Sequence, residues 1–302
     1  MHKDATRGSE AGTEVSACGH LLVVIDPAAR RSDGESVRIA KDVLGAGAPA
    51  RVCLPEDPAE FARALTRRGS RRPVVIGDDH ALLRAVAVLH RERELDGCPL
   101  SLVPVGSGRA LHLARSLGVP TGVVAAARAV LEGVERQLDL LVDDSGGVVL
   151  DALRIPSPGS PGGEEGGAVS GVPPGLDAPG WLRHCHALLR NLAARPTDRP
   201  DRPQPPAPAA STRLRVEADG VTLADLDRPV AGVSLAPTAD GLAEVEVRPW
   251  PGGDTGPLVA RARTVTVSGP DFRYRADALV AGPVRTRTWT AHAKAWSLTL
   301  PG

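Results

Sequence analysis

The sequence has few aromatic residues, few cysteines and no net charge, and each shortage excludes a class of protein. Aromatic residues make up 2% of the 302 residues, but apolar residues reach 42%, which is enough for packed cores. Lysine plus arginine and aspartate plus glutamate number 36 each, so no basic surface favours a nucleic-acid partner. No apolar run approaches the ~20 residues that span a bilayer. We therefore expect no transmembrane segment and no nucleic-acid partner.

The cysteine spacing excludes two further classes. The four cysteines are Cys18, Cys53, Cys98 and Cys185. They lie far apart and form no C-x-x-C pair, which argues against a disulfide framework and against a zinc site. His184 and His186 flank Cys185 in a helical pattern, where positions i and i+2 point in different directions and do not converge on a metal. A reducing, cytoplasmic location fits this cysteine content.

The hydrophobic pattern divides the chain into four segments, in keeping with a length that suggests two domains. Residues 1–19 are polar and are expected to form a disordered leader. Residues 20–153 alternate apolar strands with amphipathic helices, which predicts an α/β domain with a doubly wound, mostly parallel sheet. Residues 154–210 hold two Pro/Gly-rich runs around one predicted helix, as in a linker. Residues 211–302 show short alternating strands and frequent turns, which predict a β-sandwich.

Three strand-to-helix turns are the places where a ligand is expected, because ligands of open α/β sheets bind beyond the carboxyl ends of the strands. The turns are DPAAR (26–30), GDDHA (77–81) and PVGSG (104–108). Gly106 and Gly108 flank Ser107 at the start of a helix, where backbone N–H groups attract anions. An ordinary tight turn explains this Gly-Ser-Gly pattern equally well, so no single turn identifies the ligand.

The order of the turns is more specific than any one of them. The chain resembles the diacylglycerol kinase catalytic-domain family, the lipid kinases related to NAD kinase and sphingosine kinase. That family has Asn-Pro-x-Ser-Gly, Gly-Gly-Asp-Gly-Thr and Pro-x-Gly-Thr-x-Asn-Asp turns, followed by Ala-Arg-x-Leu-Gly-x-Pro. The counterparts here are DPAAR, GDDHA, PVGSG and LARSLGVP, and APTADGLAEV and ADALV in the second half match later family turns.

The resemblance implies a function and a set of partners. It implies that ATP and Mg²⁺ are the cofactors and that the γ-phosphate is transferred to a lipid hydroxyl, such as that of diacylglycerol, at a membrane surface. It also implies that the last strand returns to the α/β domain and leaves the active site in a cleft between the domains. A homodimer is compatible with these features.

The resemblance also assigns roles to particular residues. It places Asp277 as the general base, and Asp240, with the backbone carbonyls of Pro237 and Leu242, at a structural metal position. The nucleotide-binding positions are Gly77, Asp78, Asp79, His80, Ala81, Gly106, Ser107 and Arg109. For Asp240 a plain turn is an alternative, since aspartate is common in turns.

The phosphate turn departs from the family pattern and leaves two interpretations open. Asp78 and His80 replace glycines, Ala81 replaces the threonine, and Arg109 stands in place of an asparagine. In one interpretation Asp78 and Asp79 hold Mg²⁺ while Arg109 offsets phosphate charge, so the protein is an active lipid kinase. In the other, nucleotide affinity is lost and the protein is a pseudokinase that binds a lipid or a protein.

Overall fold

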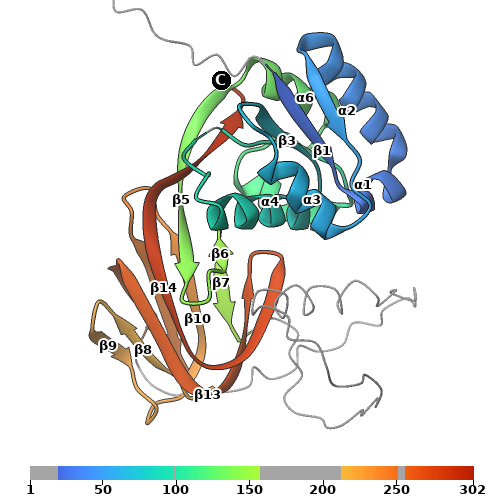
Figure 1. The fold of residues 1–302 in the computed structure, drawn as a ribbon. Coiled ribbons are helices and arrows are strands. Elements are labelled where there is room, and N and C mark those ends of the chain that lie inside the picture. Colours follow the sequence, from blue (N-terminus) through green and yellow to red (C-terminus); the bar gives the residue numbers. More distant parts are fainter. Residues whose placement is uncertain (1–19, 98, 157–211, 251–255) are drawn as a thin grey trace, which may run out of the picture.

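The computed structural model describes residues 20–97, 99–156, 212–250 and 256–302 (Figure 1). These residues form a parallel sheet covered by helices and a larger antiparallel sheet beside it. The expected leader (1–19) lies outside the described residues, as do most of the expected linker (154–210) and its helix. No helix within the described ranges is both long and apolar enough to cross a bilayer.

The parallel sheet has four strands in the order β2-β1-β3-β4. Their bounds are β1 (Leu21–Ile25), β2 (Ala50–Cys53), β3 (Arg72–Gly77) and β4 (Ser101–Pro104). Leu21, Val23 and Ile25 face one apolar core, and Leu22 and Val24 face another. Both faces of β1 are therefore buried, which is why its sequence is an unbroken apolar run.

Helices cover both faces of this sheet, as the doubly wound prediction requires. Their bounds are α1 (Pro27–Ser32), α2 (Gly34–Gly47), α3 (Pro58–Thr66), α4 (Asp79–Arg91), the 3-10 helix η1 (Gly108–Leu111), α5 (His112–Ser116) and α6 (Val123–Glu132). Helices α2 and α6 pack on one face, whereas α3, α4 and α5 pack on the other. An aspartate side chain caps the N-terminus of each of α1, α2, α3 and α4.

The antiparallel part is one hydrogen-bonded sheet of ten strands. The strands are β5 (Val134–Asp143), β6 (Val148–Val149), β7 (Leu153–Ile155), β8 (Arg215–Ala218), β9 (Val221–Ala224), β10 (Val230–Pro237), β11 (Ala243–Pro249), β12 (Leu258–Ala262), β13 (Thr264–Ala276) and β14 (Leu279–Leu300). The order is β12-β11-β10-β7-β13-β14-β5-β6, and β8 pairs with both β13 and β9. The β-sandwich prediction is met only in part, because these strands form a single sheet around a common core instead of two separate sheets. Strands β5 to β7, which the sequence places in or next to the first domain, pair within this sheet.

The last strand joins the two parts of the molecule. Figure 1 shows β14 running beside β5 from the antiparallel sheet up to the helix-covered sheet. There the N–H of Leu100 donates to the carbonyl of Ser297 at 2.8 Å, and the N–H of Thr299 donates to the carbonyl of Leu100 at 2.9 Å. The hydroxyl of Ser101 donates to that of Thr299 at 2.9 Å. The expected return of the final strand to the first domain is therefore observed.

Candidate functional site

The turns after β1, β3 and β4 lie side by side at the carboxyl edge of the parallel sheet. The N–H of Asp26 donates to the carbonyl of Ile76, and the N–H of Val105 donates to that of Gly77, both at 2.9 Å. A Cβ placed on Gly106 would lie 3.4 Å from the Cβ of Asp78, so the third turn contacts the second. The three turns therefore lie together at one edge of the sheet, as expected for turns at the carboxyl ends of parallel strands.

Gly77 is required by the close approach of two neighbours. A Cβ at this position would lie 2.6 Å from the Cβ of Ala81 and 3.0 Å from that of Asp26. Any larger residue would push α4 away from the turn after β1. The first glycine of the turn therefore has a packing role that does not depend on a ligand.

Asp78 caps helix α4. Its Oδ1 accepts the N–H of Ala81 at 3.1 Å, and its Oδ2 lies 3.5 Å from Nδ1 of His80. Burial by itself would raise the pKa of Asp78, but the hydrogen bond and charge of His80, with help from Ala81 and Arg84, outweigh burial and lower it. The same hydrogen bond raises the pKa of His80. The start of α4 thus holds a carboxylate paired with an imidazole.

Asp79 joins α4 to α5. Its side chain is buried, and its Oδ2 and Oδ1 accept the N–H groups of Leu113 and Ala114 at 2.8 and 2.9 Å. Burial raises the pKa of Asp79, and these two hydrogen bonds offset part of that effect. Both oxygens therefore bind backbone groups in the first turn of α5.

Asp26 makes the corresponding contacts at α1. Its Oδ1 accepts the N–H of Ala28 at 2.7 Å, and its Oδ2 accepts from Nη1 of Arg84 at 2.6 Å. The guanidinium of Arg84 also lies over the ring of Phe61, 5.3 Å from its centroid. A partly buried ion pair therefore links the start of α1 to α4.

The third turn presents the more accessible groups. Gly106, Ser107 and Arg109 are exposed, and the Ser107 side chain makes no capping hydrogen bond. Arg109 forms no ion pair with any residue that the structure describes. A free hydroxyl and a free guanidinium therefore remain at this edge.

Asp277 lies at the tip of the hairpin between β13 and β14, with φ of 49°. Its Oδ2 accepts the N–H of Leu150 at 2.8 Å, and its Oδ1 accepts those of Asp151 and Ala152 at 2.9 Å. Burial raises the pKa of Asp277 to about 6, against the lowering effect of these three donors. The carboxylate holds the hairpin to the segment between β6 and β7.

Asp240, with Pro237 and Leu242, lies in the turn between β10 and β11. Its carboxylate accepts hydrogen bonds from the hydroxyl of Thr238 and, at 3.3 Å, from the N–H of Leu242, and it pairs with Arg261 at 3.3 Å. The Thr238 hydroxyl lowers the pKa of Asp240. Over the described ranges no three histidine, cysteine, aspartate or glutamate side chains cluster as metal ligands. These contacts are those of an aspartate within a polar turn.

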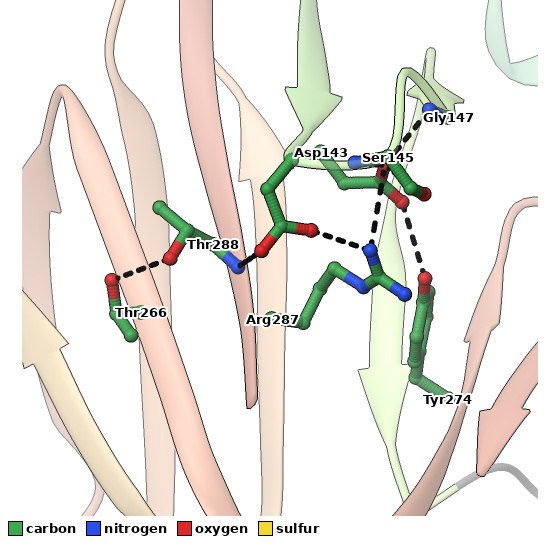
Figure 2. A network of polar contacts seen from close by, with 8 residues as sticks. Asp143, Ser145, Gly147, Thr266, Tyr274, Arg287 and Thr288 are labelled. Carbon is green, nitrogen blue, oxygen red and sulfur yellow. Dashed lines mark hydrogen bonds and ion pairs between the residues drawn. The ribbon is translucent and has the colours of Figure 1, made fainter. Parts of the chain in front are cut away.

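A second polar network went unrecognised in the sequence. Figure 2 shows Arg287 beside Asp143, the last residue of β5, and Arg287 also forms an ion pair with Asp144. The hydroxyl of Tyr274 donates to Oδ2 of Asp143 at 3.2 Å. Burial, followed by the charge of Asp143, raises the pKa of Tyr274. Asp143 also accepts from the N–H and hydroxyl of Ser145 and from the N–H of Gly147. The DDSGG turn was visible in the sequence, but its distant partners were not.

Comparison with solved structures identifies the fold. Two structures described as a "putative diacylglycerol kinase" from Bacillus anthracis str. Sterne match with TM-scores of 0.64 and 0.65. A third, described as a diacylglycerol kinase from the same organism, matches with 0.61. The chain has the fold of these proteins. Each match covers 93% of this chain and 97% of the other, at 11% sequence identity.

The likeness lies in the fold and not in the sequence. No protein-family model matches the chain, and no curated protein does. The two-part architecture of a parallel sheet and a large antiparallel sheet is therefore shared with these three structures.

Proposed function

We propose that this protein is a non-catalytic relative of the diacylglycerol kinases, a pseudokinase that acts as a binding module for a lipid or a protein. One observation carries the proposal: aspartate side chains of the chain itself already accept N–H groups at the three helix starts of the candidate site. Asp26, Asp78 and Asp79 accept the N–H groups at the starts of α1, α4 and α5.

The occupied helix starts disfavour ATP. A triphosphate binds a helix N-terminus through free N–H groups and the positive end of the helix dipole. Here the side chain of Asp78 accepts the N–H of Ala81 and places a negative charge at the same point. A like charge beside a phosphate costs about 1–4 kcal/mol. The residues at this turn therefore do not fit a triphosphate.

The carboxylates are equally ill-suited to Mg²⁺, which needs oxygen ligands with free lone pairs in octahedral geometry. Both oxygens of Asp79 bind α5, and Asp78 is paired with His80. A general base must also face the hydroxyl that it deprotonates. The carboxylate of Asp277 is turned to three backbone donors, although its pKa of about 6 would suit a base.

The competing candidate is an ATP-dependent lipid kinase. The shared fold supports it, and so do the exposed Ser107 and Arg109, which could contact a phosphate after the third turn. It requires Asp78 to leave Ala81 and His80 when nucleotide binds. That rearrangement makes the two candidates distinguishable by experiment.

Calorimetric titration with Mg²⁺ and ATP tests the proposal. We expect the wild-type chain to bind more weakly than a Kd of about 1 mM. The double substitution Asp78→Gly with His80→Gly removes the internal carboxylate and imidazole, so it should tighten binding by about ten-fold or more. The matched control is Asp57→Gly, which removes an exposed cap from α3 and should leave nucleotide binding unchanged.

Two results would contradict the proposal. Wild-type binding of ATP at micromolar concentration would show that the turn accepts nucleotide as it stands. Transfer of labelled phosphate to diacylglycerol vesicles, lost in Asp277→Asn, would establish the kinase instead.

A further inference from the structure

Strand β2 is the edge strand of the parallel sheet. Among the described residues it pairs with β1 only, and the side chains of Val52 and, just beyond the strand, Leu54 are 38% and 53% exposed. In a parallel ladder, alternate residues direct both the N–H and the C=O to the same neighbouring strand. The N–H of Leu21 donates to the carbonyl of Pro49, so Pro49 and Arg51 face β1. Ala50 and Val52 therefore direct their N–H and C=O groups outward.

A groove runs along each side of this edge. The groove towards α3 has a volume of about 350 Å³, and the groove towards α1 and α2 has about 430 Å³. Apolar side chains form the floors: Leu22, Cys53 and Ala64 in the first, and Ile25, Val37 and Val52 in the second. An added strand would place alternate side chains in the two grooves, because successive residues of a strand point to opposite faces.

The rims of both grooves are basic. Arg51 and Arg67 border the first groove, and Arg30 and Lys41 border the second. All four side chains are exposed, and none forms an ion pair with a residue that the structure describes. Two further arginines at the rims already have acidic partners, since Arg38 pairs with Glu35 and Asp42, and Arg63 with Glu60. The edge therefore carries four uncompensated positive charges, two on each side.

We propose that the β2 edge binds an extended, acidic segment of a partner protein by strand addition. The outward N–H and C=O groups of Ala50 and Val52 supply the backbone hydrogen bonds. Acidic side chains on each face of the added strand reach the cations on that side, and small apolar side chains cover the floors. The site uses none of the carboxylates of the three helix starts, so it goes beyond the proposed function and does not depend on it.

Charge disfavours a second copy of the chain as the occupant, and backbone hydrogen bonding disfavours a membrane. A second copy of the chain, paired through its own β2, would bring the same four cations against each other across the two-fold axis. An anionic membrane would attract the cations, but its headgroups present no ordered row of donors and acceptors to match the outward backbone groups of Ala50 and Val52. An acidic strand satisfies both requirements.

Fluorescence anisotropy with a defined probe tests the proposal. The probe is a fluorescein-labelled peptide, Gly-Glu-Asp-Val-Val-Glu-Asp-Val-Gly, which as a strand directs two acids to each face. The controls replace every acid with the matching amide or with lysine. We expect the full-length wild-type chain to bind the acidic peptide about ten-fold more tightly than the amide control, with a loss of affinity between about 0.05 and about 0.5 M salt. Equal binding of the acidic and amide peptides would overturn the proposal.

The variant Val52→Pro separates strand addition from simple charge attraction. It removes an outward N–H without breaking a bond to β1, and proline is tolerated at such an edge position. We expect this variant to bind the acidic peptide about ten-fold more weakly than the wild type, or weaker still. Unchanged affinity, in a variant that keeps the wild-type Tm, would refute strand addition.

Further measurements cover a Val52→Pro variant that fails to fold and the two other occupants, a second copy and a membrane. If Val52→Pro does not fold, the exposed pair Arg51→Glu and Arg67→Glu takes its place and should abolish the preference for the acidic peptide. Sedimentation that shows a dimer lost in these variants would assign the edge to a second copy. Binding to vesicles with phosphatidylserine, without binding to the peptide, would assign it to a membrane.

Discussion

At the scale of single residues, Asp78 and Asp79 are neighbours in the chain but serve different helices. Asp78 caps its own helix, α4, whereas Asp79 accepts two N–H groups from α5, more than 30 residues further along. The GDDHA pattern was sufficient to place a turn at the carboxyl edge of the sheet. It could not show where each carboxylate points, because the partners of Asp79 are set by tertiary packing.

The residue-scale prediction concerns Asp79→Ala. The substitution leaves the buried N–H groups of Leu113 and Ala114 without an acceptor, and each lost hydrogen bond to a charged group costs about 1.5–3 kcal/mol. We expect a loss of about 3–5 kcal/mol in the free energy of unfolding in urea. The control Asp57→Ala removes an exposed cap and should cost about 1 kcal/mol. Equal losses in the two variants would refute a joining role for Asp79.

At the scale of elements, the two halves of the chain differed in how well their sequence predicted them. The apolar runs that became β1 and β3 and the amphipathic run that became α4 were predicted correctly, because both faces of the sheet are buried and the helical period is regular. The segments VRTRTWTAH and AWSLTLPG were predicted as separate strands, yet both belong to β14. The pairing register shifts between His292 and Trp296, and this irregularity breaks the alternation that would have shown one strand.

At the element scale, we predict that Asp277, at the tip of the hairpin between β13 and β14, makes the free energy of unfolding depend on pH. Burial raises the pKa of Asp277 from 3.8 to about 6, so the folded state holds this proton more tightly than the unfolded chain does. The stabilisation from Asp277 is therefore complete below about pH 4 and is lost as the pH rises through about 6. We expect the wild type to lose about 1–3 kcal/mol relative to Asp277→Asn over this range, because asparagine does not titrate. This difference in the free energy of unfolding is measured by urea unfolding of both proteins between pH 4 and pH 7, with tryptophan fluorescence as the signal. Parallel profiles would exclude a raised pKa at this site.

At the scale of the whole molecule, the two parts are built around shared strands. Trp289 in β14 lies in the core of the antiparallel sheet, while Trp296 and Leu298 of the same strand lie in the core under α4. The length and the hydrophobic pattern indicated two domains and ended the first at residue 153. It could not show that β5 to β7 pair with the second sheet, because β5 finds its partner β14 about 150 residues later.

The whole-molecule prediction is that this shared strand makes the two parts unfold together. Leu298 is fully buried, so Leu298→Ala should cost about 2–5 kcal/mol. The control is Leu258→Ala in the edge strand β12, where the side chain is 39% exposed and the cost should be below about 1 kcal/mol.

Amide hydrogen exchange then shows whether the parallel-sheet part and the antiparallel sheet unfold together or independently. If β14 couples the parts, Leu298→Ala lowers the protection of amides in β3 and in β10 by the same free energy, although Leu298 belongs to the core under α4. A loss confined to β3 would mean that the antiparallel sheet is stable without its neighbour.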